Sequence, residues 1–125
     1  MKVKVKRVYD APERDDGYRV LVDRLWPRGL TKDKAKVDLW LKGVAPSEEL
    51  REWFGHDPER YEEFRRHYFE ELEGEPEQVA ALLACVKRQP VTLLYGARDA
   101  KLNNAVALLQ YIEDKLARET SRRAA

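Results

Sequence analysis

One stretch of the chain decides the fold, and it reads Arg19-Val20-Leu21-Val22-Asp23-Arg24-Leu25-Trp26-Pro27-Arg28-Gly29. Its apolar beginning is typical of a buried strand. The strand passes at once into an acid, two arginines, a tryptophan and a Pro-Arg-Gly turn. Charges and an indole crowded just beyond a strand are poorly suited to a core. They suit the binding of an anion or a planar group, so this stretch predicts a strand that leads into a site.

A second apolar run, residues 91–95, follows Pro90 and predicts another buried strand. Because helical patterns separate it from the run at 18–22, the two strands are expected to be parallel neighbours. The N-terminal segment, residues 2–9, alternates Val with Lys and predicts a first strand. Its link to the second strand is shorter than a parallel crossover usually needs. The first strand is therefore expected to be antiparallel or to be joined by an unusually tight turn.

Apolar residues three and four apart predict four helices, which begin near Ser47, Asp57, Pro76 and Lys101. The last is expected to end near Arg118, before a frayed tail at 118–125. Residues 27–46 show no long periodic element, only one helical turn near 32–36. Together these patterns predict a single small layered α/β domain over residues 1–125, with a short, mostly parallel sheet flanked by helices.

Composition limits the classes of function. The net charge of +1 gives no overall attraction to nucleic acid or membrane, and no apolar run is long enough to cross a bilayer. One cysteine, Cys85, excludes an internal disulfide, and the alternating N-terminus lacks the pattern of a signal peptide. These features favour a cytoplasmic protein. With two well-separated histidines and no Gly-rich phosphate loop, we expect no metal and no cofactor.

Polar residues follow both apolar runs, and the carboxyl ends of parallel strands meet at one edge of a sheet. The candidate ligand-binding residues there are Arg24, Trp26, Arg28, Arg98, Asn103 and Asn104. The arginines offer planar forks for phosphate or carboxylate, and Trp26 offers a stacking face. The two asparagines fall in the first turn of a helix, where free backbone N–H groups favour an anion. Weak catalytic candidates are Asp23, His56 and Asp99.

A structural interpretation stays open beside this one. Arg24 pairing with Asp99, and Arg98 with Asp23, would only fix the loops. Trp26 would be a lid on the core, and the paired asparagines would only cap a helix.

The same residues resemble the YeaO-like branch of domain-of-unknown-function family 488. The matching pieces are Arg7 to Asp10, Gly17 to Gly29, Trp40, Lys42, Ala45 to Ser47, Leu50, Arg51, Trp53, Phe54, His56, Thr92 to Tyr95, Asp99, and Asn103 to Ala105. The resemblance implies a small bacterial or archaeal cytoplasmic α/β protein and brings no established reaction, cofactor or catalytic residue. It also draws Lys42, Arg51 and His56 into the candidate site.

One position departs from the family pattern. Relatives often carry a histidine immediately before the paired asparagines, and this chain has Leu102. If that histidine were an obligatory acid or base, this chain would have to use His56 or an acid instead.

Three functional hypotheses follow. The first is a pocket for a small anionic molecule, such as a nucleotide or phosphorylated metabolite, in which Arg24, Arg28 and Arg51 bind charge. The second is a hydrolase acting on such a ligand. The third is a nucleic-acid or protein interaction module, based on the run of basic residues from Arg28 to Lys36. The near-neutral chain disfavours nucleic acid, and a homodimer remains an alternative.

Overall fold

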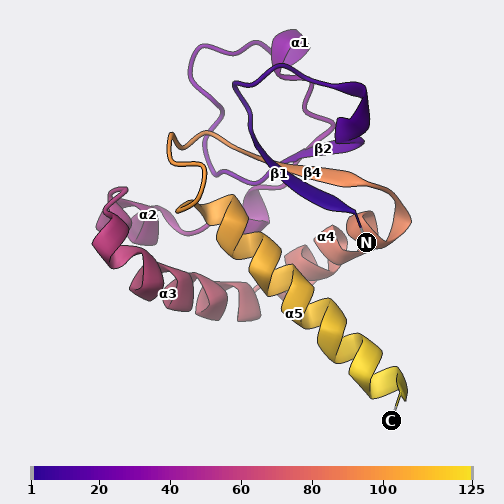
Figure 1. The fold of residues 1–125 in the computed structure, drawn as a ribbon. Helices are drawn as coiled ribbons and strands as arrows, with labels where there is room; N and C mark the ends of the chain where they lie inside the picture. The colour runs from indigo at the N-terminus through magenta and orange to yellow at the C-terminus, as the bar shows by residue number, and fades with distance from the viewer. Residues whose placement is uncertain (1, 125) are drawn as a thin grey trace.

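The computed structural model describes residues 2–124 and is built around a four-stranded parallel sheet (Figure 1). The strand order is β1-β4-β2-β3, made of β1 (Val3–Arg7), β4 (Val91–Tyr95), β2 (Tyr18–Leu21) and β3 (Leu39–Trp40). The pairing of β2 with β4 is parallel, which confirms the expectation for the two apolar runs. The α/β class predicted from the sequence is confirmed as well.

The first strand, β1, lies at one edge of the sheet and is separated from β2 by β4. β1 pairs with β4 in parallel, with Val5 opposite Leu93, so the antiparallel alternative is wrong. The reason is that β1 and β2 are not neighbours, since β4 is inserted between them. The link at 8–17 crosses β4 on its way back, and the hydroxyl of Thr92 donates to the carbonyl of Asp16 at 2.6 Å.

Over residues 2–124, five helices complete the fold: α1 (Lys32–Ala35), α2 (Glu48–Phe54), α3 (Tyr61–Glu73), α4 (Pro76–Arg88) and α5 (Asn104–Ala124). Short 3-10 turns lie at Arg14–Asp16, Lys42–Val44 and Pro58–Arg60. The side chain of Ser47 accepts from the backbone N–H of Leu50, so α2 starts at the predicted cap. α5 starts later and runs further than the predicted 101–118. β3 was not predicted, because two residues carry no periodic signal.

The two faces of the sheet are covered differently (Figure 1). Helices α2 to α5 pack on one face, where the core includes Val20, Leu93, Phe64, Tyr68 and Ile112. Loops and α1 cover the other face, and a smaller cluster there is formed by Val8, Leu21, Ala35 and Leu94. The alternation of strand side chains between the two faces explains this division.

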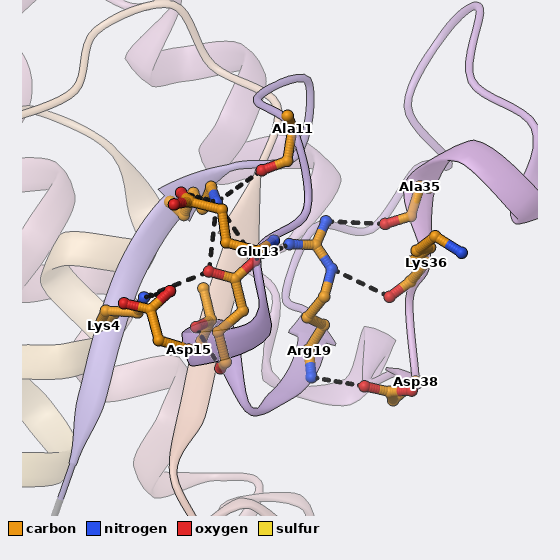
Figure 2. A network of polar contacts seen from close by, with 11 residues as sticks. Lys4, Ala11, Glu13, Asp15, Arg19, Ala35, Lys36 and Asp38 are labelled. Carbon is orange, nitrogen blue, oxygen red and sulfur yellow. Dashed lines mark hydrogen bonds and ion pairs between the residues drawn. The ribbon is translucent and has the colours of Figure 1, made fainter.

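Asp16 is the polar centre of the loop-covered face. It is 1% exposed, and Arg19 reaches it from β2 at 2.5 Å. Lys4 and Lys6, side by side on one face of β1, contact it at 3.2 Å each. Arg19 also donates to the carbonyls of Ala35 and Lys36, so it joins the link at 8–17 to the carboxyl end of α1 (Figure 2).

The surroundings of Asp16 keep it ionised. Burial by itself raises the pKa of Asp16. Hydrogen bonds from the Glu13 backbone and from Lys6, Lys4 and Arg19 outweigh burial, and the pKa lies well below its ordinary value. This network therefore depends on a negative charge at its centre.

Candidate functional site

A hollow of about 200 Å³ lies where β2 and β4 end and α5 begins. Its polar lining is Asp23, Arg24, Arg51, His56, Asn103 and Asn104. The rest of the lining is Leu25, Pro46, Phe54, Phe64, Gly96 and Ala97. Segments far apart in the sequence meet here because the strands are parallel and adjacent, so that their carboxyl ends share one edge.

Asp23 follows β2 and fastens three elements together. The side-chain amide of Asn104 donates to one of its carboxylate oxygens at 3.0 Å, and the backbone N–H of Gly96 donates to the other at 2.8 Å. Burial raises the pKa of Asp23 above its ordinary value, although Asn104, Gly96, Arg51 and His56 act to lower it. Within residues 2–124, the ion pairs do not include Asp23.

Two arginines line the same hollow without a carboxylate partner in the described part of the chain. Arg24 donates weakly to the carbonyls of Pro46 and Ala45, at 3.2 and 3.3 Å. Arg51 comes from α2 and is exposed. By contrast, Arg19, Arg60 and Arg65 each pair with an acid. Guanidinium groups that face a hollow with donors to spare can bind a phosphate or carboxylate.

The amino end of α5 adds to the positive character of the hollow. Asn103 caps the helix, since its side-chain oxygen accepts from the N–H of Val106 at 2.9 Å. Its carbonyl accepts from the buried hydroxyl of Tyr61 at 3.0 Å, and burial raises the pKa of Tyr61 to about 12, so it remains a neutral donor. Because the helix dipole is positive at this end, an anion in the hollow is favoured.

The apolar wall belongs to the main core. Phe54 and Phe64 stack with ring centroids 4.4 Å apart and are 5% and 1% exposed. Leu25, on the loop after β2, also lines the hollow, but unlike the two phenylalanines it is 59% exposed. Behind the wall, the hydroxyl of Tyr68 donates to the carbonyl of Val44, which fixes the segment that holds Arg24.

His56 has a backbone that histidine seldom adopts. Gly55 ends α2 with φ 53°, and His56 follows with φ 59°, so two left-handed residues stand in a row. For a residue with a Cβ this conformation costs about 1–2 kcal/mol. The surrounding fold holds it, and the side chain of His56 is thereby directed to the hollow beside Phe54.

Replacement of His56 tests this strain directly. We expect His56→Gly to be more stable than His56→Ala by about 1 kcal/mol, because glycine adopts positive φ without a Cβ penalty while alanine retains it. Chemical denaturation of the two variants measures the difference. Equal stabilities would show that the backbone at this position is not strained.

The remaining candidates lie away from the hollow or support it from outside. The indole of Trp26 donates to the carbonyl of Leu30 at 2.7 Å and packs edge-on against Trp40. Lys42 lies 4.0 Å from the centre of the Trp40 ring. Asp99 accepts from the backbone N–H groups of Lys101 and Leu102 and so shapes the turn before α5.

Arg28 and Arg98 are exposed and are not part of the lining. The carbonyl of Arg28 accepts from the hydroxyl of Tyr9 at 2.9 Å, which fastens the loop after β2. The ion pairs considered above, Arg24 with Asp99 and Arg98 with Asp23, do not form within residues 2–124. Arg24 bonds to the backbone instead.

Sequence reasoning did not assign Phe54, Phe64, Pro46 and Leu25 to the site. Phe54 and Phe64 belong to helical apolar stripes, and such stripes look the same whether they face only the core or also a hollow. The position of Leu25 could have been recognised, because a single leucine among charged residues after a strand is unusual on a surface that binds nothing.

The fold and the hollow define an α/β protein with a candidate binding site at the carboxyl edge of a parallel sheet. The family described as the inactive DUF488-N3 subclade, DUF488-N3i, matches residues 2–125. The chain belongs to this family.

Similar chains from bacteria are named as uncharacterized proteins. One from Mycobacterium tuberculosis is 44% identical over 114 residues, which cover 91% of this chain and 96% of the relative. The uncharacterized protein YeaO of Escherichia coli is 43% identical over 112 residues, or 90% of this chain and 97% of YeaO. No solved structure matches the chain. In the part of the chain that the structure describes, none of the helices has the length and apolar character needed to span a bilayer.

Proposed function

We propose that the hollow binds a small anionic molecule, such as a phosphorylated or carboxylated metabolite, without transforming it. The observation that carries the proposal is the pair Arg24 and Arg51. Both line the hollow, and neither has an acidic partner in the described chain. The amino end of α5 supports the same sign of ligand charge.

The size of the hollow limits the ligand. About 200 Å³ is below the range of roughly 300–1,000 Å³ that is typical of sites for drug-sized ligands. A small metabolite therefore fits the proposal better than a whole dinucleotide. For a mononucleotide, only one part of the molecule would be enclosed.

Binding without turnover is favoured over the hydrolase alternative. The family is described as inactive. The family resemblance also implies a histidine at the position where this chain has Leu102. Asp23 has a raised pKa, as general acids and bases often do, so it is the residue on which a hydrolase would most depend. Screening of phosphoester and ester hydrolysis tests this, and turnover that disappears in Asp23→Asn would establish the hydrolase instead.

A nucleic-acid module is disfavoured by the placement of the tryptophans. Trp26 and Trp40 pack against each other over the smaller core cluster, so their rings are engaged within the protein. Stacking of single-stranded bases requires free aromatic faces.

Titration calorimetry with phosphate, small carboxylates and mononucleotides tests the proposal. We expect Arg24→Ala and Arg51→Ala each to weaken binding by about tenfold or more, because a hydrogen bond to a charged group contributes about 1.5–3 kcal/mol. Arg88→Ala is the matched control, since Arg88 is exposed and ends α4 just before β4 starts, at the opposite edge of the sheet. Equal losses in all three variants, or no binding by the wild type, would contradict the proposal.

A further inference from the structure

The hollow presents charges of both signs that do not neutralise one another. Asp23 is held by Gly96 and Asn104, while Arg24 is turned toward the carbonyls of Ala45 and Pro46. Arg51 acts on Asp23 as a charge at a distance, and the hydrogen bonds found among residues 2–124 do not join the two side chains. Hydrogen bonds to the backbone and to a side-chain amide thus keep the opposite charges apart within one small space.

The carboxylate of Asp23 has capacity to spare. An ionised carboxylate has about four acceptor positions, and the described contacts from Asn104 and Gly96 occupy two of them. Both of these donors are neutral. A charge in partly buried surroundings without an ion pair is unfavourable, and a cationic group on a ligand would relieve this. Burial raises the pKa of Asp23 more than the hydrogen bonds from Asn104 and Gly96 and the charge of Arg51 lower it.

The backbone packs closely around the Asp23 side chain. A Cβ at position 96 would lie 3.2 Å from an oxygen of Asp23, so glycine permits the approach of the β4 end to this carboxylate. The carbonyl of Asp23 is also fixed, because the indole of Trp40 donates to it at 2.7 Å. The position of the carboxylate is therefore set before any ligand arrives, as an efficient binding site requires.

From this separation of charges we infer that the ligand is a small zwitterion, whose protonated amine binds Asp23 and whose carboxylate or phosphate binds Arg24 and Arg51. An apolar group on the same molecule packs against Phe54, Phe64 and Leu25. An α-amino acid with an apolar side chain is the simplest molecule of this class. The inference rests on the proposed function and adds to it the positive group and the apolar group of the ligand.

Three matched series test the inference by titration calorimetry on the wild-type chain. Leucine, phenylalanine and phosphoethanolamine are each compared with the N-acetyl derivative, which keeps the anionic group and lacks the cation. We expect at least one zwitterion to bind about tenfold or more tighter than its N-acetyl derivative, since a charge-assisted hydrogen bond is lost on acetylation. Leucinamide, which keeps the cation alone, should bind more weakly than leucine.

The variant Asp23→Asn separates the two parts of the site. It should abolish the preference for the zwitterion while affinity for the N-acetyl derivative changes little, because Arg24 and Arg51 remain. The wild-type series keeps the test valid if this variant does not fold.

The possible outcomes distinguish the inference from the proposed function. Equal binding of the zwitterions and their N-acetyl derivatives would overturn the inference that the ligand is a zwitterion, and the proposed anion-binding function would remain supported. Binding of none of these molecules, together with none of the anions named above, would overturn both. A preference that survives in Asp23→Asn would show that the amine binds elsewhere and would also overturn the assignment.

Discussion

Replacement of Asp16 by asparagine should lower the free energy of unfolding by about 3–5 kcal/mol, which is the usual result of removing one partner from a buried ion pair. Asp16 is 1% exposed and its carboxylate contacts Arg19, Lys6 and Lys4. Without that charge, the buried guanidinium of Arg19 would lack its counter-ion. Urea denaturation monitored by circular dichroism measures the loss.

The neighbouring acid provides a matched control. Asp15 has a side chain that is 78% exposed, and its ion pair is with Lys4 at 3.4 Å. The change Asp15→Asn should alter stability by no more than about 0.5 kcal/mol, as is usual for an exposed ion pair. Similar losses for the two variants would refute the special role of Asp16.

The same residue gives the fold a defined dependence on pH. The pKa of Asp16 is lowered in the folded state, so its contribution is fully present above the ordinary carboxyl value of about 3.9 and is lost as the pH falls below it. Stability curves of the wild type should therefore fall steeply on acidification below that value. The curve of Asp16→Asn should be flatter there, and parallel curves would contradict the assignment.

Replacement of Phe64 by alanine should cost about 3–5 kcal/mol, as is usual when a large aromatic side chain is removed from a core. Phe64 is 1% exposed and contacts the rings of Phe54, Tyr61 and Tyr68. Its ring also lines the hollow, so the change should enlarge the hollow and leave a cavity in the core. Thermal and chemical denaturation measure the effect.

Phe69→Ala is the matched control for this change, because it removes the same ring from the same helix. Phe69 is only partly buried and its ring meets Tyr111 edge-on. We expect it to cost less than half as much as Phe64→Ala. If Phe69→Ala were the more damaging change, the main core would not be centred where the structure places it.

Parts of the fold were accessible from the sequence because they depend on local or strongly patterned signals. The runs at 18–22 and 91–95 are mostly apolar, with only Arg19 and Thr92 as polar members, which is typical of strands buried on both faces in a parallel sheet. Ser47 was recognisable as a cap because its hydroxyl serves a nearby N–H group of its own helix.

Other parts depend on which distant segments meet, and no local pattern reports that. The place of β1 follows from the insertion of β4 beside it, which involves residues about ninety positions away. Asp16 precedes Gly17 and has the local signature of a turn. Its burial becomes clear only when Lys4, Arg19 and Thr92 are known to lie in one row across the sheet.

The candidate site shows the same division. Asp23, Arg24 and Asn104 were predicted to lie together because parallel strand ends gather at one edge, and all three line the hollow. The turning of Trp26 into the smaller core cluster was not decided by the sequence, because an indole suits a ligand surface and a core equally well. The structure distinguishes the two through the contacts of Trp26 with Trp40 and Leu30.

The position of β4 between β1 and β2 has a consequence for synthesis of the chain on the ribosome. The inner strand β4 is the last strand of this sheet to be made, and β1 has β4 as its partner in the sheet. A nascent chain that ends before Val91 holds only the short β2–β3 pair of this sheet, and its apolar strand residues stay open to water or to other chains. Assembly of the sheet therefore waits until Val91–Tyr95 has been made and has left the ribosome.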